Sequence, residues 1–221
     1  MNELGAAWSP DGTKLVFDHP RDGDTEIYVQ SVTGIRRLTD NERSDLFPSW
    51  SPDGRHIAFL SDRDGDGTHV YVMNSDGSNE ERLSTDDAGA LRPTWMHDSR
   101  HVGYTALDCG GGYCTGTIKI VAVESHDATT IERGKFVDMR QPSFAGDGRI
   151  GFAGADEFND EGIFVADPDG RHRRTVGGGI GGGSDPVWAP DATRIAYDCG
   201  YGICVVRLGR RSERLLRTTG A

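Results

Sequence analysis

Short runs of β-branched and aromatic residues alternate along the chain with clusters of Pro, Asp, Asn and Gly. A clear example holds Phe-Pro-Ser-Trp at residues 47–50, Ser-Pro-Asp-Gly at 51–54 and Ile-Ala-Phe at 57–59. Short apolar runs bounded by turn residues predict strands. The turn residues fit this pattern, because Pro presets φ, Asp accepts a backbone hydrogen bond and Gly adopts positive φ. The pattern therefore predicts short strands joined by tight turns.

This unit recurs along the chain, and an aromatic residue ends the first strand of every copy. These anchors are Trp8, Trp50, Trp95, Phe144 and Trp188, which lie 42, 45, 49 and 44 residues apart. Repeats of roughly 40–45 residues with four short strands each are typical of propeller blades. We therefore predict an all-β fold, a single β-propeller domain over residues 1–221 with five four-stranded blades. The predicted blades cover approximately residues 1–40, 41–87, 88–133, 134–177 and 178–221.

The ends of the chain bear on how such a ring would close. The first strand of the first unit ends at Trp8, and the outer strand of the last unit lies near Arg214. No terminal strand is left over, so we expect closure without an exchanged terminal strand, through packing of the first blade on the fifth. The recurrence of the anchors at one position favours packing between sheets over a ring that stacks on a ligand.

The second unit carries a family resemblance. Between residues 47 and 84 it reads Pro-x-Trp-Ser-Pro-Asp-Gly, Ile-Ala-Phe, Ser-x-Arg-Asp-Gly, Tyr-Val-Met-Asn-x-Asp-Gly and Arg-Leu-Ser. This run resembles the TolB-type propeller repeat, and weaker copies cover nearly the whole chain. The resemblance implies a propeller. In TolB the propeller follows a small α/β domain that engages envelope proteins, and in prolyl-oligopeptidase relatives it accompanies a hydrolase domain. Neither companion is recognisable here, so the resemblance predicts the fold and leaves the activity to the site.

Charge and hydropathy narrow the classes of partner. The formal net charge of −11 argues against nucleic acid and anionic membranes, which require a positive surface. No apolar run approaches the ~20 residues that a membrane-spanning helix needs, so we expect no membrane insertion. Residues 1–4 have neither the basic region nor the apolar core of a secretory leader.

The four cysteines form two pairs with identical spacing. Cys109 and Cys114 flank four residues, as do Cys199 and Cys204, and both pairs lie between the second and third strands of a unit. Such a loop sets its flanking residues opposite one another, which suits a disulfide. The alternatives are free thiols or a four-thiolate zinc site, although the two units are not neighbours in a ring. Two disulfides imply an oxidising compartment, so we expect a periplasmic or extracellular protein whose leader is absent from these residues.

Asp62, Asp64 and Asp66 alternate before a glycine, like the first half of a calcium loop. The second half is missing, because Val70 and Met73 stand where further ligands are expected. The alternative is a solvated hairpin turn, in which Asp-Gly is an ordinary pair. We expect no cofactor or weakly bound calcium.

Strand alternation also gathers acidic residues on one face of the predicted ring, at the turns between second and third strands and at the connectors between blades. We take the acidic binding face to include Asp18, Asp22, Asp24, Asp108, Asp156 and Asp198. An acidic rim would attract cations or a basic peptide; the alternative is that the charge serves solubility alone.

No catalytic residue stands out. The chain has no Gly-x-Ser-x-Gly motif, and its histidines recur at no position common to all five repeats and form no metal-spaced pair. The sequence favours a non-catalytic binding or scaffold propeller, exported and monomeric, that engages a protein or a basic peptide through the acidic face. The alternatives are a metal-dependent hydrolase or lyase with its site at the acidic channel mouth, and a fragment of a larger propeller protein.

Overall fold

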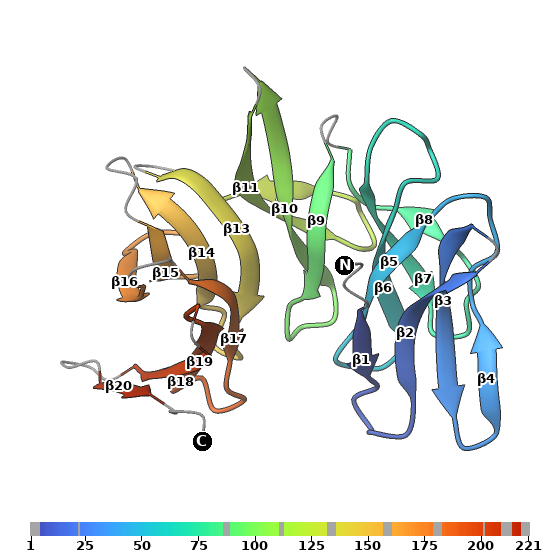
Figure 1. The fold of residues 1–221 in the computed structure, drawn as a ribbon, viewed down its shortest axis with the longest axis horizontal. Helices are drawn as coiled ribbons and strands as arrows, with labels where there is room; N and C mark the ends of the chain where they lie inside the picture. Colours follow the sequence, from blue (N-terminus) through green and yellow to red (C-terminus); the bar gives the residue numbers. More distant parts are fainter. Residues whose placement is uncertain are drawn as a thin grey trace.

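The computed structural model describes residues 5–21, 23–85, 89–110, 113–131, 136–156, 161–178, 183–200, 202–208 and 214–217. In these residues the structure consists of strands and turns, grouped in five four-stranded antiparallel sheets without a helix (Figure 1). This confirms the predicted all-β propeller architecture of five four-stranded blades. The described residues contain no helix that could span a bilayer.

Each sheet is built from four consecutive strands. The first sheet comprises β1 (Ala6–Trp8), β2 (Leu15–Arg21), β3 (Asp24–Ser31) and β4 (Gly34–Arg37). The second comprises β5 (Asp45–Trp50), β6 (His56–Ser61), β7 (His69–Asn74) and β8 (Glu81–Arg82). The third comprises β9 (Ala90–Trp95), β10 (His101–Gly110), β11 (Tyr113–Ala122) and β12 (Ala128–Thr130). The fourth comprises β13 (Phe136–Phe144), β14 (Ile150–Asp156), β15 (Glu161–Ala166) and β16 (Arg174–Gly177). The fifth comprises β17 (Ser184–Trp188), β18 (Arg194–Asp198), β19 (Ile203–Arg207) and β20 (Arg214–Arg217).

The turn after each anchor is held by an aspartate, as the sequence predicted. Asp11 accepts a hydrogen bond from the backbone N–H of Thr13, two residues on, at 3.0 Å. A hydrogen bond from Ser9 Oγ, supported by the one from Thr13, lowers the pKa of Asp11 to about 2. The third unit keeps the same turn although Ser99 replaces glycine, because Ser99 itself adopts a positive φ of 59°.

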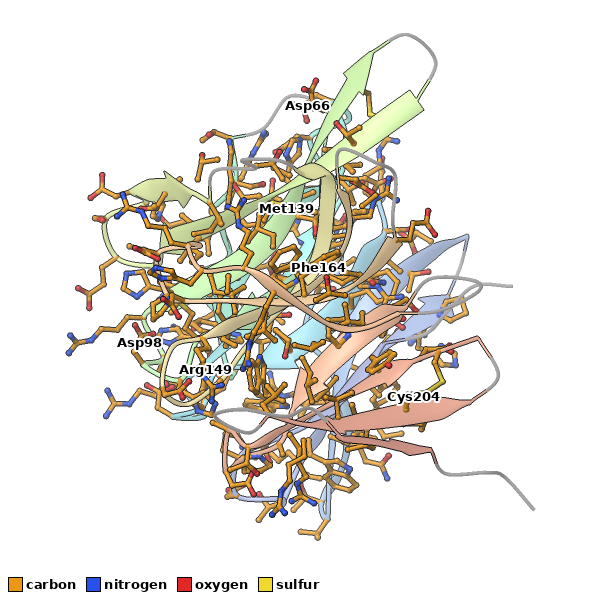
Figure 2. The ribbon with its side chains drawn as sticks, turned by 90° about the vertical axis from the view of Figure 1, so that its left-hand side faces the viewer. Asp66, Asp98, Met139, Arg149, Phe164 and Cys204 are labelled. Carbon is orange, nitrogen blue, oxygen red and sulfur yellow. A yellow bond between two sulfur atoms is a disulfide. The ribbon has the colours of Figure 1, made fainter. Side chains whose placement is uncertain are left out.

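Neighbouring sheets pack face to face. On the second sheet, Trp50 and Phe59 share one face, which we call the anchor face, and they pack on the first sheet. Val70 and Val72 lie on the opposite face, which we call the aliphatic face, and they pack on Trp95 of the third sheet. The same alternation of anchor face on aliphatic face joins the third, fourth and fifth sheets. Figure 2 shows Met139 and Phe164 inside this stack, whereas Asp66 and Asp98 lie at its periphery.

The five sheets follow one another along an arc, with the first and fifth sheets at its two ends (Figure 1). No described strand is exchanged between the end sheets, and how the ring closes stays a prediction. The expected closing contact is not found: every pair of consecutive sheets packs together, but no strand of the fifth sheet packs in this way against the described strands of the first. The described strands therefore form an open arc.

Candidate functional site

The first strand of four sheets contains a β-bulge at the residue before its proline. Phe47, Arg92, Gln141 and Asp185 have positive φ values of 51°, 45°, 54° and 51°. The strand register shifts across each of them. Positive φ is costly for residues other than glycine, and such strain is concentrated at functional sites. Bulges also redirect side chains, and they are common beside active sites.

These four side chains, from four different sheets, meet one another. Arg92 Nη1 lies 2.6 Å from Asp185 Oδ1, although the two residues are 93 positions apart. Gln141 Nε2 donates to Asp185 Oδ1 at 3.1 Å, and Gln141 Oε1 accepts from the Asp185 backbone N–H at 3.0 Å. The guanidinium of Arg92 also lies 5.5 Å from the centre of the Phe47 ring. We call these four residues the bulge cluster.

The bulge cluster is accessible to a ligand. The side chains of Arg92 and Asp185 are 38% and 42% exposed. An ion pair with this exposure contributes about 0–1 kcal/mol, so a ligand that supplies its own charges can replace it at low cost.

A pocket of about 350 Å³ adjoins the bulge cluster and shares Gln141 with it. It lies between the fourth sheet and the start of β17. Its lining consists of Asp138, Arg140, Gln141, Ala153, Gly154, Ala155, Glu161, Gly183 and Ser184. Ser184 Oγ donates to Asp185 Oδ2 at 3.0 Å, which links the far wall of the pocket to the cluster.

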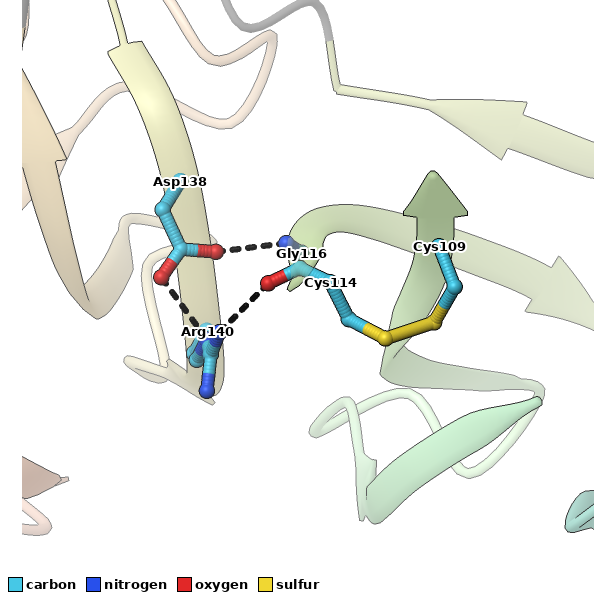
Figure 3. The surroundings of a disulfide bond; sticks show 5 residues. All are labelled: Cys109, Cys114, Gly116, Asp138 and Arg140. Carbon is cyan, nitrogen blue, oxygen red and sulfur yellow. Dashed lines mark hydrogen bonds and ion pairs between the residues drawn. A yellow bond between two sulfur atoms is a disulfide. The ribbon is translucent and has the colours of Figure 1, made fainter. Parts of the chain in front are cut away.

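One wall of the pocket is tied to a disulfide-bonded hairpin (Figure 3). Asp138 Oδ2 lies 2.7 Å from Arg140 Nε, and Asp138 Oδ1 accepts from the backbone N–H of Gly116. Arg140 Nη2 donates to the backbone carbonyl oxygen of Cys114 at 3.0 Å. Cys114 is bonded to Cys109 in the hairpin between β10 and β11. These contacts hold the third and fourth sheets together beside the pocket.

The structure contains both disulfides that the cysteine spacing led us to expect. The Cα atoms of Cys109 and Cys114 are 4.1 Å apart, and those of Cys199 and Cys204 are 5.8 Å apart. Cys204 belongs to the apolar cluster between the fourth and fifth sheets.

The carboxylates proposed for calcium are held by protein donors. Asp62 Oδ1 accepts from the Ser44 backbone N–H at 2.8 Å. Asp64 Oδ2 accepts from the Tyr71 hydroxyl at 2.6 Å and from Arg82 Nη1 at 2.8 Å. The hydrogen bond from Tyr71, followed by that from Arg82, lowers the pKa of Asp64.

The third carboxylate of this turn, Asp66, has its Oδ1 2.8 Å from His69 Nε2. This hydrogen bond lowers the pKa of Asp66. Within the described ranges, no group of three or more His, Cys, Asp or Glu is placed to hold a metal ion. Weak calcium binding therefore stays a prediction.

The residues of the predicted acidic face differ in whether they are buried or exposed. Asp18 is only 1% exposed, because its carboxylate accepts from the backbone N–H groups of Gly5 at 2.8 Å and Phe47 at 2.7 Å. Burial raises its pKa, with the backbone hydrogen bonds opposing this effect. Asp18 thus joins two sheets and is not part of an accessible rim.

The other residues of the predicted acidic face differ in exposure. Asp108 and Asp198 are exposed, and Asp24 is half-buried. Asp22 and the side chain of Asp156 lie outside the described residues.

The bulge cluster was not predicted from the sequence. The available signal was the residue before each recurrent proline, because Phe, Arg, Gln and Asp occupy that position while the proline and the aromatic anchor after it recur. A position that varies within an otherwise repeated run points to a role other than folding.

Comparisons with known proteins agree with the architecture. A family model described as the TolB beta propeller domain matches residues 2–198. No curated protein matches the chain. The structure resembles TolB from Acinetobacter baumannii at 16% identity and a TM-score of 0.73, covering 93% of this chain and 51% of that one. The chain therefore spans about half the length of that TolB.

Two further solved structures show the same likeness. A putative TolB from Agrobacterium tumefaciens matches at 15% identity and a TM-score of 0.74, over 96% of this chain and 80% of that one. An oligogalacturonate lyase in complex with manganese matches at 16% identity and a TM-score of 0.73, over 98% and 65% of the respective chains. At these identities the likeness concerns the fold alone.

Proposed function

The chain belongs to the TolB β-propeller domain family, and on this premise we propose that it is a non-catalytic binding module. It takes a segment of a protein or peptide partner at the bulge cluster and the adjoining pocket. The observation that carries this proposal is the convergence of four different side chains from four sheets, each held by a bulge. Variable residues on a rigid scaffold are the usual means by which a repeat fold acquires a partner.

The size of the pocket supports a partner segment as the ligand. A volume of about 350 Å³ lies near the lower end of the range for small-molecule sites, roughly 300–1,000 Å³. The pocket fits one or two side chains of a partner. The neighbouring bulge cluster offers an aromatic ring, an amide and groups of both charges to the partner's backbone beside those side chains.

The charges of the site favour a basic side chain. Asp138, Glu161 and Asp185 are present with Arg92 and Arg140, so that acids exceed bases by one. Both arginines are already paired with aspartates, and Glu161 is exposed at the pocket wall. A lysine or arginine of the partner would balance the one excess acidic charge of the site. The two disulfides further support an exported protein that meets its partner in the periplasm or outside the cell.

A charged model peptide tests this proposal. Fluorescently labelled octalysine should bind the protein at low ionic strength, and more weakly as salt rises from roughly 50 to 200 mM. Glu161→Gln and Asp185→Asn should each weaken binding by about two- to fivefold. Glu124→Gln serves as a matched control, because Glu124 is exposed in the turn after β11, at the other end of the third sheet. Equal loss in all three variants, or no binding at all, would contradict the proposed site.

A metal titration separates this proposal from metal-dependent catalysis. Because Asp64 and Asp66 are engaged by Tyr71, Arg82 and His69, an ion must displace these donors. We expect calcium and manganese to bind no tighter than about 10⁻⁴–10⁻³ M in isothermal titration. Replacing Asp62, Asp64 and Asp66 together with Asn should remove any such binding. Micromolar affinity would instead favour a metal-dependent hydrolase or lyase.

A further inference from the structure

The hairpin of β10 and β11 is longer than its counterparts and carries the Cys109–Cys114 disulfide near its tip. Its strands have ten residues each, whereas the second and third strands of the other sheets have five to eight. In Figure 1 it projects beyond the neighbouring sheets. Asp108, Cys109 and Cys114 are exposed. This end of the hairpin is therefore held by cross-strand pairing and by the disulfide, with little packing around it.

The backbone behind the disulfide lies directly against the pocket wall on β13. A Cβ atom on Gly116 would lie 2.5 Å from the backbone oxygen of Met139, so this approach requires glycine. Gly116 donates its N–H to Asp138 Oδ1, and the carbonyl oxygen of Cys114 accepts from Arg140 Nη2 at 3.0 Å (Figure 3). Asp138 and Arg140 both line the pocket. Two side chains of the pocket are thus held by backbone atoms at or beside one cysteine of the bridge.

The same hairpin also holds the bulge residue of the fourth sheet. Thr105 on β10 is fully buried, and its Oγ1 accepts from the backbone N–H of Gln141 at 3.0 Å. Gln141 in turn bonds Asp185 in the bulge cluster. The hairpin therefore positions two consecutive residues of β13, Arg140 at the pocket and Gln141 at the bulge cluster.

The second disulfide has different surroundings. Cys204 is only 6% exposed and belongs to the apolar cluster between the fourth and fifth sheets, and Cys199 is half-buried. Thiol–disulfide exchange requires attack on an accessible sulfur. A thiol can therefore reach the bridge of Cys109 and Cys114 more readily than the bridge of the fifth sheet.

We propose that the Cys109–Cys114 disulfide is a redox switch for the binding site: the pocket takes its partner in the oxidised protein and loses affinity when the bridge is open. This inference rests on the function proposed above and adds its regulation. When the bridge closes, the two thiols lose two protons and two electrons to the disulfide form of a thiol oxidoreductase, which leaves as a dithiol. When it opens, a dithiol reductant returns the same protons and electrons and leaves as a disulfide.

The open form loses affinity because the pocket wall is no longer held. Without the bridge, the exposed end of the hairpin frays more readily, since no covalent link limits the separation of its strands. Fraying withdraws the Cys114 carbonyl group from Arg140 and the Gly116 N–H from Asp138. Arg140 can then turn into the pocket, where its charge repels a basic side chain of the partner. The site thus becomes competent only after the chain has met an oxidising compartment.

Binding of labelled octalysine to the two redox forms tests this proposal. A mild dithiol should open Cys109–Cys114 in the folded protein well before Cys199–Cys204, as alkylation and mass spectrometry can follow. The affinity for octalysine should then fall about three- to tenfold, the worth of roughly one net hydrogen bond, and reoxidation should restore it. A bridge that the dithiol does not open, or an affinity that changes less than about twofold, would overturn the proposal.

The matched control is Cys109→Ser with Cys114→Ser, because both positions are exposed and accept a hydroxyl group. This variant should bind as weakly as the reduced protein and should not respond to the dithiol. A remaining response would assign the effect to the bridge of the fifth sheet and would overturn the proposal. Arg140→Gln cuts the link between the Cys114 carbonyl group and the pocket, so its two redox forms should bind alike. A full response in Arg140→Gln would also count against the switch.

Hydrogen exchange separates failure of this inference from failure of the proposed function. If octalysine binds neither redox form, the proposed partner is wrong, but the amides of Gly116 and Gln141 still report on the pocket wall. Faster exchange at both amides after the bridge is opened would support control of the pocket by the disulfide. Unchanged exchange would overturn it.

Discussion

The middle and end sheets share one repeat but differ in how many of their faces are buried. In the second sheet, β6 is buried at five consecutive residues after His56, and β7 is buried throughout except at Asn74. In the fifth sheet, buried and more accessible residues alternate along β18 and β19. Sheets inside the arc are therefore covered on both faces, and the fifth sheet on one. In the first sheet the exposed part of the anchor face lies at Trp8, because β3 is buried from Thr25 to Val29.

This difference does not follow the residue types. Trp8, Leu15 and Phe17 on the open side of the first sheet are as apolar as Trp50, Ile57 and Phe59 on the covered side of the second. The fifth sheet likewise keeps Ala196, Ile203 and Val205 on its open face. The end sheets thus carry apolar residues on both faces. Only the position of a sheet in the arc decides whether a neighbouring sheet packs on each face.

The sharpest comparison is between two tryptophans at one repeat position. Trp50→Ala removes a buried ring from the junction of the first two sheets, and it should lower the free energy of unfolding by about 3–5 kcal/mol. Trp8→Ala should cost less than about 1 kcal/mol, because the ring is 66% exposed. Urea unfolding of the two variants measures the difference. Equal losses would show that Trp8 is covered in solution.

A second pair places the same side chain on a covered and on an open face. A Cβ on Gly103 would lie 2.3 Å from Cζ of Phe144 in the fourth sheet, so Gly103→Val should cost about 2–3 kcal/mol through overpacking. Ala196 has the corresponding register position on the fifth sheet. Ala196→Val should change stability by less than about 0.5 kcal/mol. Thermal unfolding of both variants checks this, and a large loss at Ala196 would mean that its face is packed.

The disulfides allow a comparison between a middle and an end sheet. Removing either bridge with paired Cys→Ser changes should cost about 2 kcal/mol, since both close short loops. The fifth-sheet pair should cost more, because Cys204 is only 6% exposed and Ser would place a hydroxyl in an apolar cluster. Denaturant unfolding measures both variants, and non-reducing mass spectrometry should find both bridges intact. Four alkylatable thiols in protein from an oxidising compartment would contradict this prediction.

The smallest expected effect concerns two aspartates at equivalent positions. Asp18→Asn keeps one acceptor oxygen but turns an amide toward a second backbone N–H, and it should cost about 1–2 kcal/mol. Asp198→Asn should cost less, because Asp198 Oδ1 accepts from the Gly200 backbone N–H at 2.7 Å within its own exposed hairpin and the side-chain oxygen of Asn can accept the same bond. Urea unfolding at neutral pH distinguishes the two, and equal effects would mean that Asp198 already joins two sheets.

The pH dependence of the Asp18 variant adds a second measurement. Burial raises the pKa of Asp18 above 3.8 in the folded protein. The stability contributed by this group is therefore present below the unfolded pKa and is lost as pH rises through the folded pKa. Asp18→Asn should lack this component, so the difference between wild type and variant should be larger under acidic conditions.

Much of the fold could be predicted because its signals are local. The Ser-Pro-Asp-Gly turn sets its own geometry, as Asp11 and Thr13 show, and a strand's alternation follows from its apolar residues. The bulge cluster could not be predicted in this way. The contact of Arg92 with Asp185 joins residues 93 positions apart, and it depends on how the sheets are placed around the arc.

The sequence by itself determined the period, the four strands of each unit and the pairing of the cysteines, because each depends on residues close together in the chain. Only the tertiary structure decided that Asp18 is buried between sheets and that Trp8 is exposed. Burial depends on which sheet comes to lie against a face, and one repeat pattern is compatible with either outcome. For this reason the same aromatic anchor is buried in four of the sheets and exposed, as Trp8, in the first sheet.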